Sequence, residues 1–247
     1  MAYDIRPLSF TEVLDRAFAV LRDQFWLLVG ISAVAWVPYG VLLALAGPKG
    51  LGFQAAALLV LMVLGPVAYT ALAVAVAAVY LGSPVTVSEA YRSTRAILVS
   101  IVGTYLLMYV FLVLLTILLV LPAVYFAICW VLVSPVMIVE DCFGRAALRR
   151  SRTLVSGSWW RTFGLMVVVG LITAVPAGAL QLFWSYIPFF GPILNAGTQA
   201  VTSSYSLVVL VVYYFDRRCR TEDFDLHHLA QQIRSEGAAA APGSSLA

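Results

Sequence analysis

One group of polar residues stands out within the last hydrophobic segment of the chain. Its members are spaced i, i+3, i+4, i+7 and i+11, so on an α-helix they form one face: Asn195, Thr198, Gln199, Thr202 and Ser206. Amide side chains are costly in hydrocarbon, so we expect this polar stripe to face protein or water. It could bond neighbouring helices together, at about 0.6 kcal/mol per contact, or it could line a polar path or ligand groove.

A second candidate is the acidic pair Glu140 and Asp141, which ends the fourth apolar segment. Acids at membrane depth can mark ion or proton sites. At the membrane edge they can instead pair with arginines, which here complete an interfacial charge cluster: Arg145, Arg149, Arg150 and Arg152. Both acids lie at the segment boundary, and no apolar segment carries a central charge. The sequence therefore favours ion pairing and disfavours an ion-coupled pump.

Other signatures of catalysis are missing from the sequence. The histidines His227 and His228 are adjacent, so on a helix they point about 100° apart and do not converge easily on a metal. The cysteines Cys129, Cys142 and Cys219 form no C-x-x-C pair, so no disulfide or zinc site is predicted. The sequence contains neither the phosphate-binding loop G-x-x-x-x-G-K-[ST] nor a Gly-x-Ser-x-Gly motif. We therefore expect no catalytic residues, no metal site and no cofactor.

The elements that must position these residues are membrane helices. Of the 247 residues, 62% are apolar and 11% are charged, whereas soluble domains carry about 25% charged residues. Such a chain cannot cover a surface that faces only water, so part of its solvent must be lipid. We expect an all-α integral membrane protein with one polytopic membrane domain over residues 1–236. The Ala-, Gly- and Ser-rich tail over residues 237–247 is expected to be disordered.

Six apolar runs approach or exceed the roughly 20 residues that a membrane-spanning helix needs. They cover residues 25–46, 53–80, 97–121, 123–139, 162–184 and 193–215. The uncharged stretch 97–139 is about twice too long for one span, so we place a turn between two helices at Pro122. No cleavable secretory signal precedes the first run, which we therefore expect to remain as an anchor.

The placement of arginine predicts the orientation. Arginines precede the first run, separate the second from the third and the fourth from the fifth, and follow the sixth, whereas the opposite side has only Lys49. The positive-inside rule then places both termini in the cytoplasm and the chain in the cell (inner) membrane. The basic segments predict contact with anionic lipids of the cytoplasmic leaflet, at about 1 kcal/mol per residue. Nothing in the sequence predicts binding to nucleic acid.

A weak internal repeat organises the runs as three helical hairpins, each preceded by a short amphipathic interfacial helix. The first two of these helices begin with capping boxes, Ser9–Glu12 and Thr86–Glu89, whose side chains satisfy free backbone N–H groups. On the first helix, Phe18 is among the residues of the apolar face. The third helix, near residues 144–155, has an apolar face and an arginine face but no capping box. A further apolar face predicts a helix after the last run: Leu226, Leu229, Ala230 and Ile233.

Three segments resemble the membrane domain that is attached to some bacterial glycerophosphoryl diester phosphodiesterases. They are Arg6–Phe18, then Ala147–Ser151 with Trp159–Gly164, and finally Tyr213–Asp216 with Phe224–Leu226. The resemblance implies a stand-alone membrane member of that family. In the fused members the chemistry belongs to a separate barrel-shaped domain. No such domain is expected within these 247 residues, so the resemblance does not imply that activity here.

Three hypotheses about function remain open. The favoured one is a non-enzymatic membrane module that assembles with a partner membrane protein or with itself as a homo-oligomer, in association with glycerolipids. The alternative is a small transporter or channel subunit whose path follows the polar stripe. The third is a lipid-modifying membrane enzyme, for which only Glu140 and Asp141 offer acid–base groups.

Overall fold

The computed structural model describes residues 7–46 and 50–222, and this part of the chain is helical with short turns and no strand. Its helices are α1 (Phe10–Asp23), α2 (Phe25–Ala46), α3 (Leu51–Tyr80), α4 (Val87–Arg95), α5 (Leu98–Leu118), α6 (Val120–Cys129), α7 (Val133–Val139), α8 (Arg145–Val155), α9 (Trp159–Trp184) and α10 (Gly191–Glu222). Within the described ranges, six stretches are long and apolar enough to cross a membrane: Phe25–Leu45, Gly52–Tyr80, Leu98–Leu118, Val120–Val139, Trp159–Trp184 and Gly191–Glu222. The predicted all-helical membrane class and its six candidate spans are thus confirmed.

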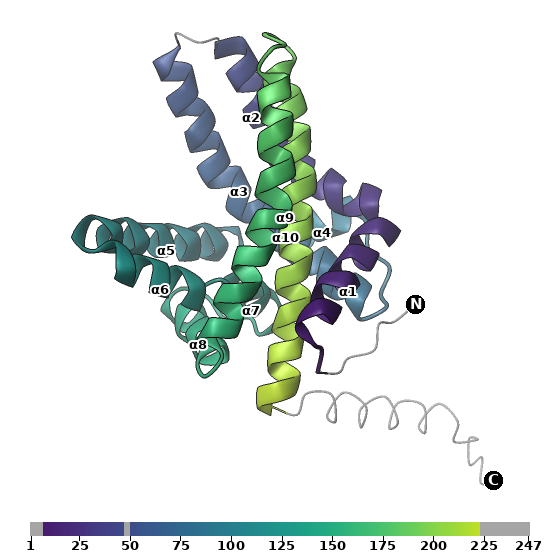
Figure 1. Ribbon diagram of the computed structural model, residues 1–247, viewed down its shortest axis with the longest axis vertical. Helices are drawn as coiled ribbons and strands as arrows, with labels where there is room; N and C mark the ends of the chain where they lie inside the picture. The colour runs from purple at the N-terminus through teal and green to yellow at the C-terminus, as the bar shows by residue number, and fades with distance from the viewer. Residues whose placement is uncertain (1–6, 47–49, 223–247) are drawn as a thin grey trace, which may run out of the picture.

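Helix α10 lies at the centre of the molecule. It packs against α2, α9 and α1, and also touches α3, α7 and α8 (Figure 1). Every residue from Leu207 to Arg217 is buried. Since a helix turns through all directions in four residues, this part of α10 is enclosed on every side.

The pair α5–α6 is arranged differently from the other long helices. In Figure 1, α2, α3, α9 and α10 stand upright, whereas α5 and α6 pack against each other and project sideways as an arm. Apolar side chains at the tip of this arm are exposed, among them Ile117, Leu118 and Leu121. The arm meets the rest of the molecule mainly where α5 contacts α3 and α6 contacts α8 and α9.

The first two short helices begin as their sequences predict. At α1, the backbone N–H of Glu12 donates to Ser9 Oγ at 3.3 Å, and the Ser9 N–H donates to the Glu12 carboxylate at 2.6 Å. At α4, Thr86 and Glu89 form the same two bonds at 3.3 and 2.8 Å. Phe18, which is expected on the apolar face of α1, is 61% exposed, and the residues of α1 that are buried within the protein are Val13, Ala17, Val20 and Leu21.

The turn between the third and fourth runs lies at Leu119 and not at the predicted Pro122. Leu119 is extended, with φ −162° and ψ 123°, and α6 begins at the next residue. Pro122 is then the third residue of α6. Proline is tolerated in a first helical turn, where its missing N–H would have no partner within the helix. Here proline marks the start of a helix and does not form the turn itself.

The fourth run is not one continuous helix, contrary to prediction. It breaks after Cys129 and resumes at Val133 as α7. The break leaves carbonyl groups without helical partners, and Ser151 of α8 donates to one of them, the Cys129 oxygen, at 2.8 Å. The fifth and sixth runs are longer than predicted, since α9 starts at Trp159 and α10 continues to Glu222. The predicted helix at residues 226–233, the two histidines and the predicted tail lie outside the described residues.

Candidate functional site

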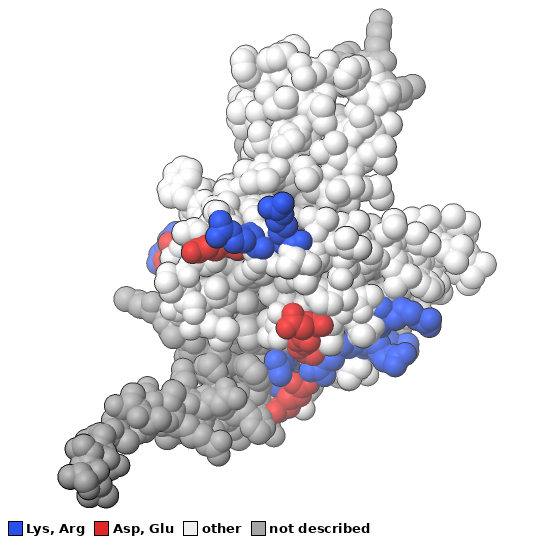
Figure 2. All heavy atoms as spheres, turned by 180° about the vertical axis from the view of Figure 1, so that it is seen from behind, with Lys and Arg blue, Asp and Glu red and all other residues white. Residues whose placement is uncertain are grey.

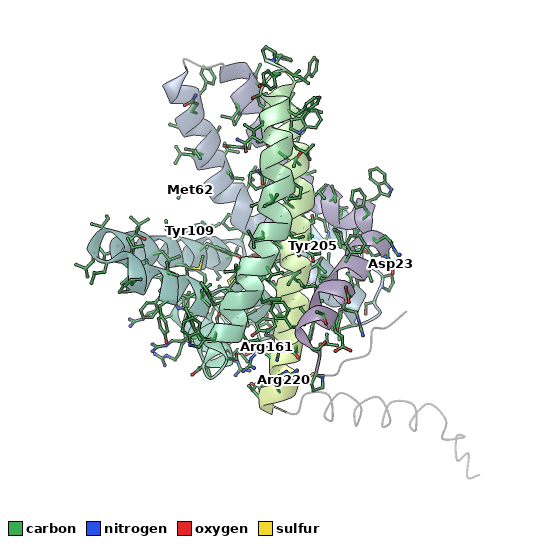
Figure 3. All side chains as sticks on the ribbon, viewed as in Figure 1. Asp23, Met62, Tyr109, Arg161, Tyr205 and Arg220 are labelled. Carbon is green, nitrogen blue, oxygen red and sulfur yellow. The ribbon has the colours of Figure 1, made fainter. Side chains whose placement is uncertain are left out.

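Two hollows lie beside α10, and the lining of the first is mainly apolar and includes five aromatic rings. This aromatic hollow has a volume of about 410 Å³ and is bounded by α2, α3, α5, α10 and the broken fourth span. Its rings are those of Trp36, Tyr69, Tyr105, Tyr109 and Trp130. Figure 3 labels Tyr109 near the base of the arm.

The second, polar hollow has a volume of about 370 Å³ and lies mainly between α9 and α10. Its polar lining comprises Thr173 and Gln181 from α9 and Gln199, Thr202 and Ser206 from α10. It shares three lining residues with the aromatic hollow: Trp36, Tyr69 and Ser203. The indole N–H of Trp36 donates to Ser203 Oγ at 3.1 Å, so this bond lies on the border between the two hollows.

The polar stripe divides into two parts in the structure. Gln199, Thr202 and Ser206 line the polar hollow. Thr198 instead accepts a hydrogen bond from the Trp184 indole at 3.2 Å, which joins α9 to α10. The Asn195 Oδ1 atom is buried and has no hydrogen-bond partner among the described residues. The stripe is therefore partly a helix contact and partly the wall of a hollow.

Sequence reasoning missed the closest polar contacts between α2 and α10. Ser32 Oγ lies 2.7 Å from Ser204 Oγ, and both side chains are buried. On α10, Ser203 and Ser204 follow the stripe residue Thr202 by one and two positions. The adjacent pair Ser203–Ser204 was the available signal, because small hydroxyl residues favour close helix packing in membranes.

Only two members of the predicted charge cluster are joined by an ion pair. The guanidinium of Arg150 donates to both oxygens of Glu140, at 2.5 and 3.1 Å, and this bond raises the pKa of Arg150 above its usual value. Tyr214 donates to Glu140 at 2.9 Å, and Arg150 also pairs with Glu222, which pairs with Arg218 at 2.9 Å. The carboxylate of Glu140 is thus held by three donor atoms in a network that joins α8 to α10.

The other predicted members lie apart from that network. Asp141, Arg145, Arg149 and Arg152 are exposed. None of them forms an ion pair within the ranges that the structure covers, and Arg152 lies over the Phe126 ring at 5.6 Å from its centroid. The three exposed arginines are therefore available to groups outside the chain.

A buried carboxylate that sequence reasoning did not single out ties the N-terminal segment to α10. Asp216 is 1% exposed and accepts from the Leu8 N–H at 2.8 Å and from Arg220 at 2.9 Å. Arg161 lies 3.3 Å from its other oxygen and donates to the Leu8 carbonyl at 2.8 Å. Figure 3 labels Arg161 and Arg220 close together near the end of α10. The only sequence signal was an aspartate directly after an aromatic run.

The charged side chains on one face of the molecule form two groups, one over α4 and one over α8 and the end of α10, with white atoms between them (Figure 2). Figure 2 shows blue and red atoms over the region of α4, α8 and the end of α10, while the described atoms around the α2–α3 and α9–α10 turns are white on this face. Within residues 7–46 and 50–222, no three His, Cys, Asp or Glu side chains gather to hold a metal ion.

These features define a multi-pass α-helical membrane protein. Residues 90–234 match the family described as "Domain of unknown function (DUF8558)", and this range is more than half of the 247 residues. The chain belongs to this family. The matched range begins in α4 and includes all of α5 to α10. Neither a curated protein nor a solved structure matches the chain.

Proposed function

We propose that this protein is a non-enzymatic module of the cell membrane that assembles with a partner membrane protein or with a second copy of itself. The observation that carries the proposal is the arm formed by α5 and α6. It projects away from the upright helices (Figure 1) and leaves Ile117 79% and Leu121 81% exposed. Helices of a multi-pass protein gain van der Waals contacts by packing on other helices, and the arm has a long surface still free for such packing.

The charge distribution supports an orientation with both termini in the cytoplasm. The short helices α1, α4 and α8 each precede two candidate membrane spans in the chain, in keeping with three hairpins introduced by interfacial helices. On α8, Leu148 and Val155 are buried while Arg145, Arg149 and Arg152 are exposed. Such a helix can lie at the cytoplasmic surface, with its arginines against anionic headgroups. The resemblance to phosphodiesterase membrane domains adds an association with glycerolipids to the proposal.

The test of orientation uses two engineered cysteines on opposite sides. Thr153 on α8 and Ser185 at the end of α9 are both exposed, whereas the natural Cys219 is buried and cannot serve as a probe. In a background without natural cysteines, T153C should react with an impermeant thiol reagent only in inside-out vesicles, and S185C only in intact cells. The reverse pattern would overturn the orientation.

The test of assembly places a photoreactive amino acid at Leu121 on the arm. The matched control is Leu171 on α9, which is also apolar and 58% exposed. Irradiation of membranes should give a protein–protein adduct from Leu121 and only lipid adducts from Leu171. Mass spectrometry of the adduct distinguishes a second copy from another protein. Lipid adducts alone at both positions would refute the proposal.

The absence of enzymatic activity is proposed from the environment of Glu140. Its oxygens accept from Arg150 and Tyr214, so the carboxylate is part of an ion-pair network that joins α8 to α10. The purified protein should not hydrolyse glycerophosphodiesters. Turnover that disappears in Glu140→Gln would contradict this proposal.

A transport function is the second candidate, because Gln199, Thr202 and Ser206 of the sixth candidate span line a hollow. If that hollow belongs to a water path, cysteines at Asn195, Gln199 and Thr202 should react with a small water-soluble reagent. Cysteines at Val201 and Leu207 should not. If the stripe only holds helices together, none should react, and Gln199→Leu should change the free energy of unfolding by less than about 1 kcal/mol.

A further inference from the structure

The two hollows have complementary chemistry and meet at one place. Among the described residues that line them, none is Asp, Glu, Lys, Arg or His. The mainly apolar lining of one hollow includes five rings, and the lining of the other includes amides and hydroxyls; Trp36, Tyr69 and Ser203 belong to both. Each has a volume within the range of about 300–1,000 Å³ that is usual for ligand pockets.

We propose that the two adjacent hollows open into each other and together form a binding site for one uncharged, single-chain membrane amphiphile of the monoacylglycerol kind. Its apolar chain occupies the aromatic hollow and its hydroxyl-bearing head occupies the polar hollow. A phosphate or carboxylate head would enter without a counter-charge, because the lining carries none, and burying an unpaired charge is strongly unfavourable. The inference rests on the membrane location in the proposed function but not on assembly with a partner.

The polar hollow presents the hydrogen-bonding groups that such a head requires. Within the described ranges, the side-chain amide of Gln181 makes no hydrogen bond. Thr202 donates its hydroxyl proton to the backbone carbonyl of Thr198 at 3.1 Å, and Ser206 donates its own to the backbone carbonyl of Thr202 at 2.9 Å. The hydroxyl oxygen of each side chain keeps lone pairs that can accept from a ligand hydroxyl. Gln181 is exposed, and its amide can both donate to and accept from the hydroxyl groups of such a head.

The aromatic hollow contains the second structural indication of a ligand. Trp130 and Val131 lie in the break between α6 and α7, and both line this hollow. Non-helical backbone at membrane depth is tolerated where it is buried in protein or lines a cavity. The break thus places an indole ring and irregular backbone at the wall that an apolar chain would contact. Indole and phenol rings provide wide apolar surfaces for such a chain.

Gly178 offers a way to fill the polar hollow without disturbing the fold. It lines that hollow, and a Cβ atom added at Gly178 meets nothing within 4 Å. Gly170 on the same helix is equally open but lines neither hollow, so Gly170→Leu is the matched control for Gly178→Leu. A second pair tests the aromatic hollow, because a Cβ at Gly65 makes only an ordinary 3.8 Å contact with Leu61, and Gly103 on α5 is open.

The experiment measures photolabelling of the full chain in lipid nanodiscs by a monoacylglycerol that carries a diazirine in its acyl chain. Label should map to α3, α5 or the α6–α7 break and should be displaced by unlabelled monoacylglycerol. Gly178→Leu and Gly65→Leu should each lower the apparent affinity about tenfold or more, as expected for steric filling of a binding site. Gly170→Leu and Gly103→Leu should leave it unchanged. Two independent filling variants keep the test valid if one of them does not fold.

Three outcomes would overturn the inference. One is equal labelling of the filling variants and their controls, and another is labelling spread over the lipid-facing surface. The third is equal displacement by phosphatidylglycerol or a fatty acid, which would show that the site takes charged or bulk lipid. The Leu121 cross-link is measured on the same variants. Loss of labelling specificity with an intact cross-link would refute only the lipid site, and the converse would refute only assembly.

Discussion

Helices α10 and α5 are both long enough to cross a membrane, but they differ in how the chain uses them. In the most apolar window of α10, 72% of the residues are buried inside the protein, against 17% in the corresponding window of α5. The more buried helix is the less apolar of the two. In a soluble protein the reverse is expected, because apolar burial drives folding in water. The comparison indicates that the solvent around these helices is lipid and not water, so that the more apolar helix is not the more buried one.

Small and polar residues account for the central position of α10. Lipid chains are as apolar as leucine, so close packing and hydrogen bonds decide which helices associate. Ser204 of α10 bonds Ser32 of α2. Gly40 lets the two backbones approach, since a Cβ there would lie 2.6 Å from the Ala196 Cβ. On α5, by contrast, Thr116 bonds only the carbonyl of Leu112 in its own helix.

The largest expected effect comes from removing the buried charge of Asp216, which fixes the end of α10 to Leu8. Asp216→Asn should lower the free energy of unfolding by about 3 kcal/mol, the lower end of the range for broken buried pairs. The lower end applies because Arg161 and Arg220 are partly exposed and because the amide oxygen can still accept from Leu8. Unfolding by titration with dodecyl sulfate in mixed micelles measures the change.

The matched control is Asp141→Asn, at an exposed acid that forms no ion pair within residues 7–46 and 50–222. Asparagine tolerates the positive φ of 48° at this position, so the change should stay below about 0.5 kcal/mol. Similar losses in the two variants would mean that the Asp216 network does not hold α10 in place.

The next largest effect contrasts one glycine in the packed region with one on the arm. Gly40→Ala places a methyl group 2.6 Å from the Ala196 Cβ and 2.8 Å from the Pro192 oxygen, so it should cost about 1–3 kcal/mol by overpacking. Gly103→Ala meets nothing within 4 Å and should be neutral or stabilise α5 by up to about 1 kcal/mol. The same micelle titration compares them. A destabilising Gly103→Ala would show that the arm is covered within the folded chain.

The parts of the fold that local signals control could be predicted from the sequence. Apolar run length gave the six candidate spans, and the spacing of Ser9 and Glu12 gave the start of α1 correctly. Pro122 was interpreted as a turn because proline disfavours helix interiors, but that rule does not hold in a first turn. The extended residue is Leu119, whose side chain gives no such signal.

Contacts between distant segments could not be predicted in the same way. Leu8 and Asp216 are 208 positions apart, and Ser32 and Ser204 are 172 apart, so no periodicity within one helix relates them. The polar stripe was found because its five members share one helix. Its division between the Trp184 contact and the polar hollow depends on α9 and α2, which periodicity along α10 does not describe.

The smallest expected loss of stability comes from removing one hydroxyl group, either from the bond between α2 and α10 or from a bond inside α5. Ser204 has a single proton, and the Ala200 carbonyl lies 2.7 Å from its oxygen. If that carbonyl takes the proton, Ser32 is the donor in the 2.7 Å contact between the two serines. Ser32→Ala removes this interhelical bond and should cost about 0.6 kcal/mol, the average for such contacts in membranes. Thr116→Val removes only a bond within α5 and should cost less.

The double variant Ser32→Ala/Ser204→Ala tests whether the two hydroxyls interact. It should lose less stability than the sum of the losses in the two single variants, because both substitutions break the same bond. Strict additivity, measured by the same titration, would show that the two hydroxyls do not interact and that packing alone holds α2 against α10.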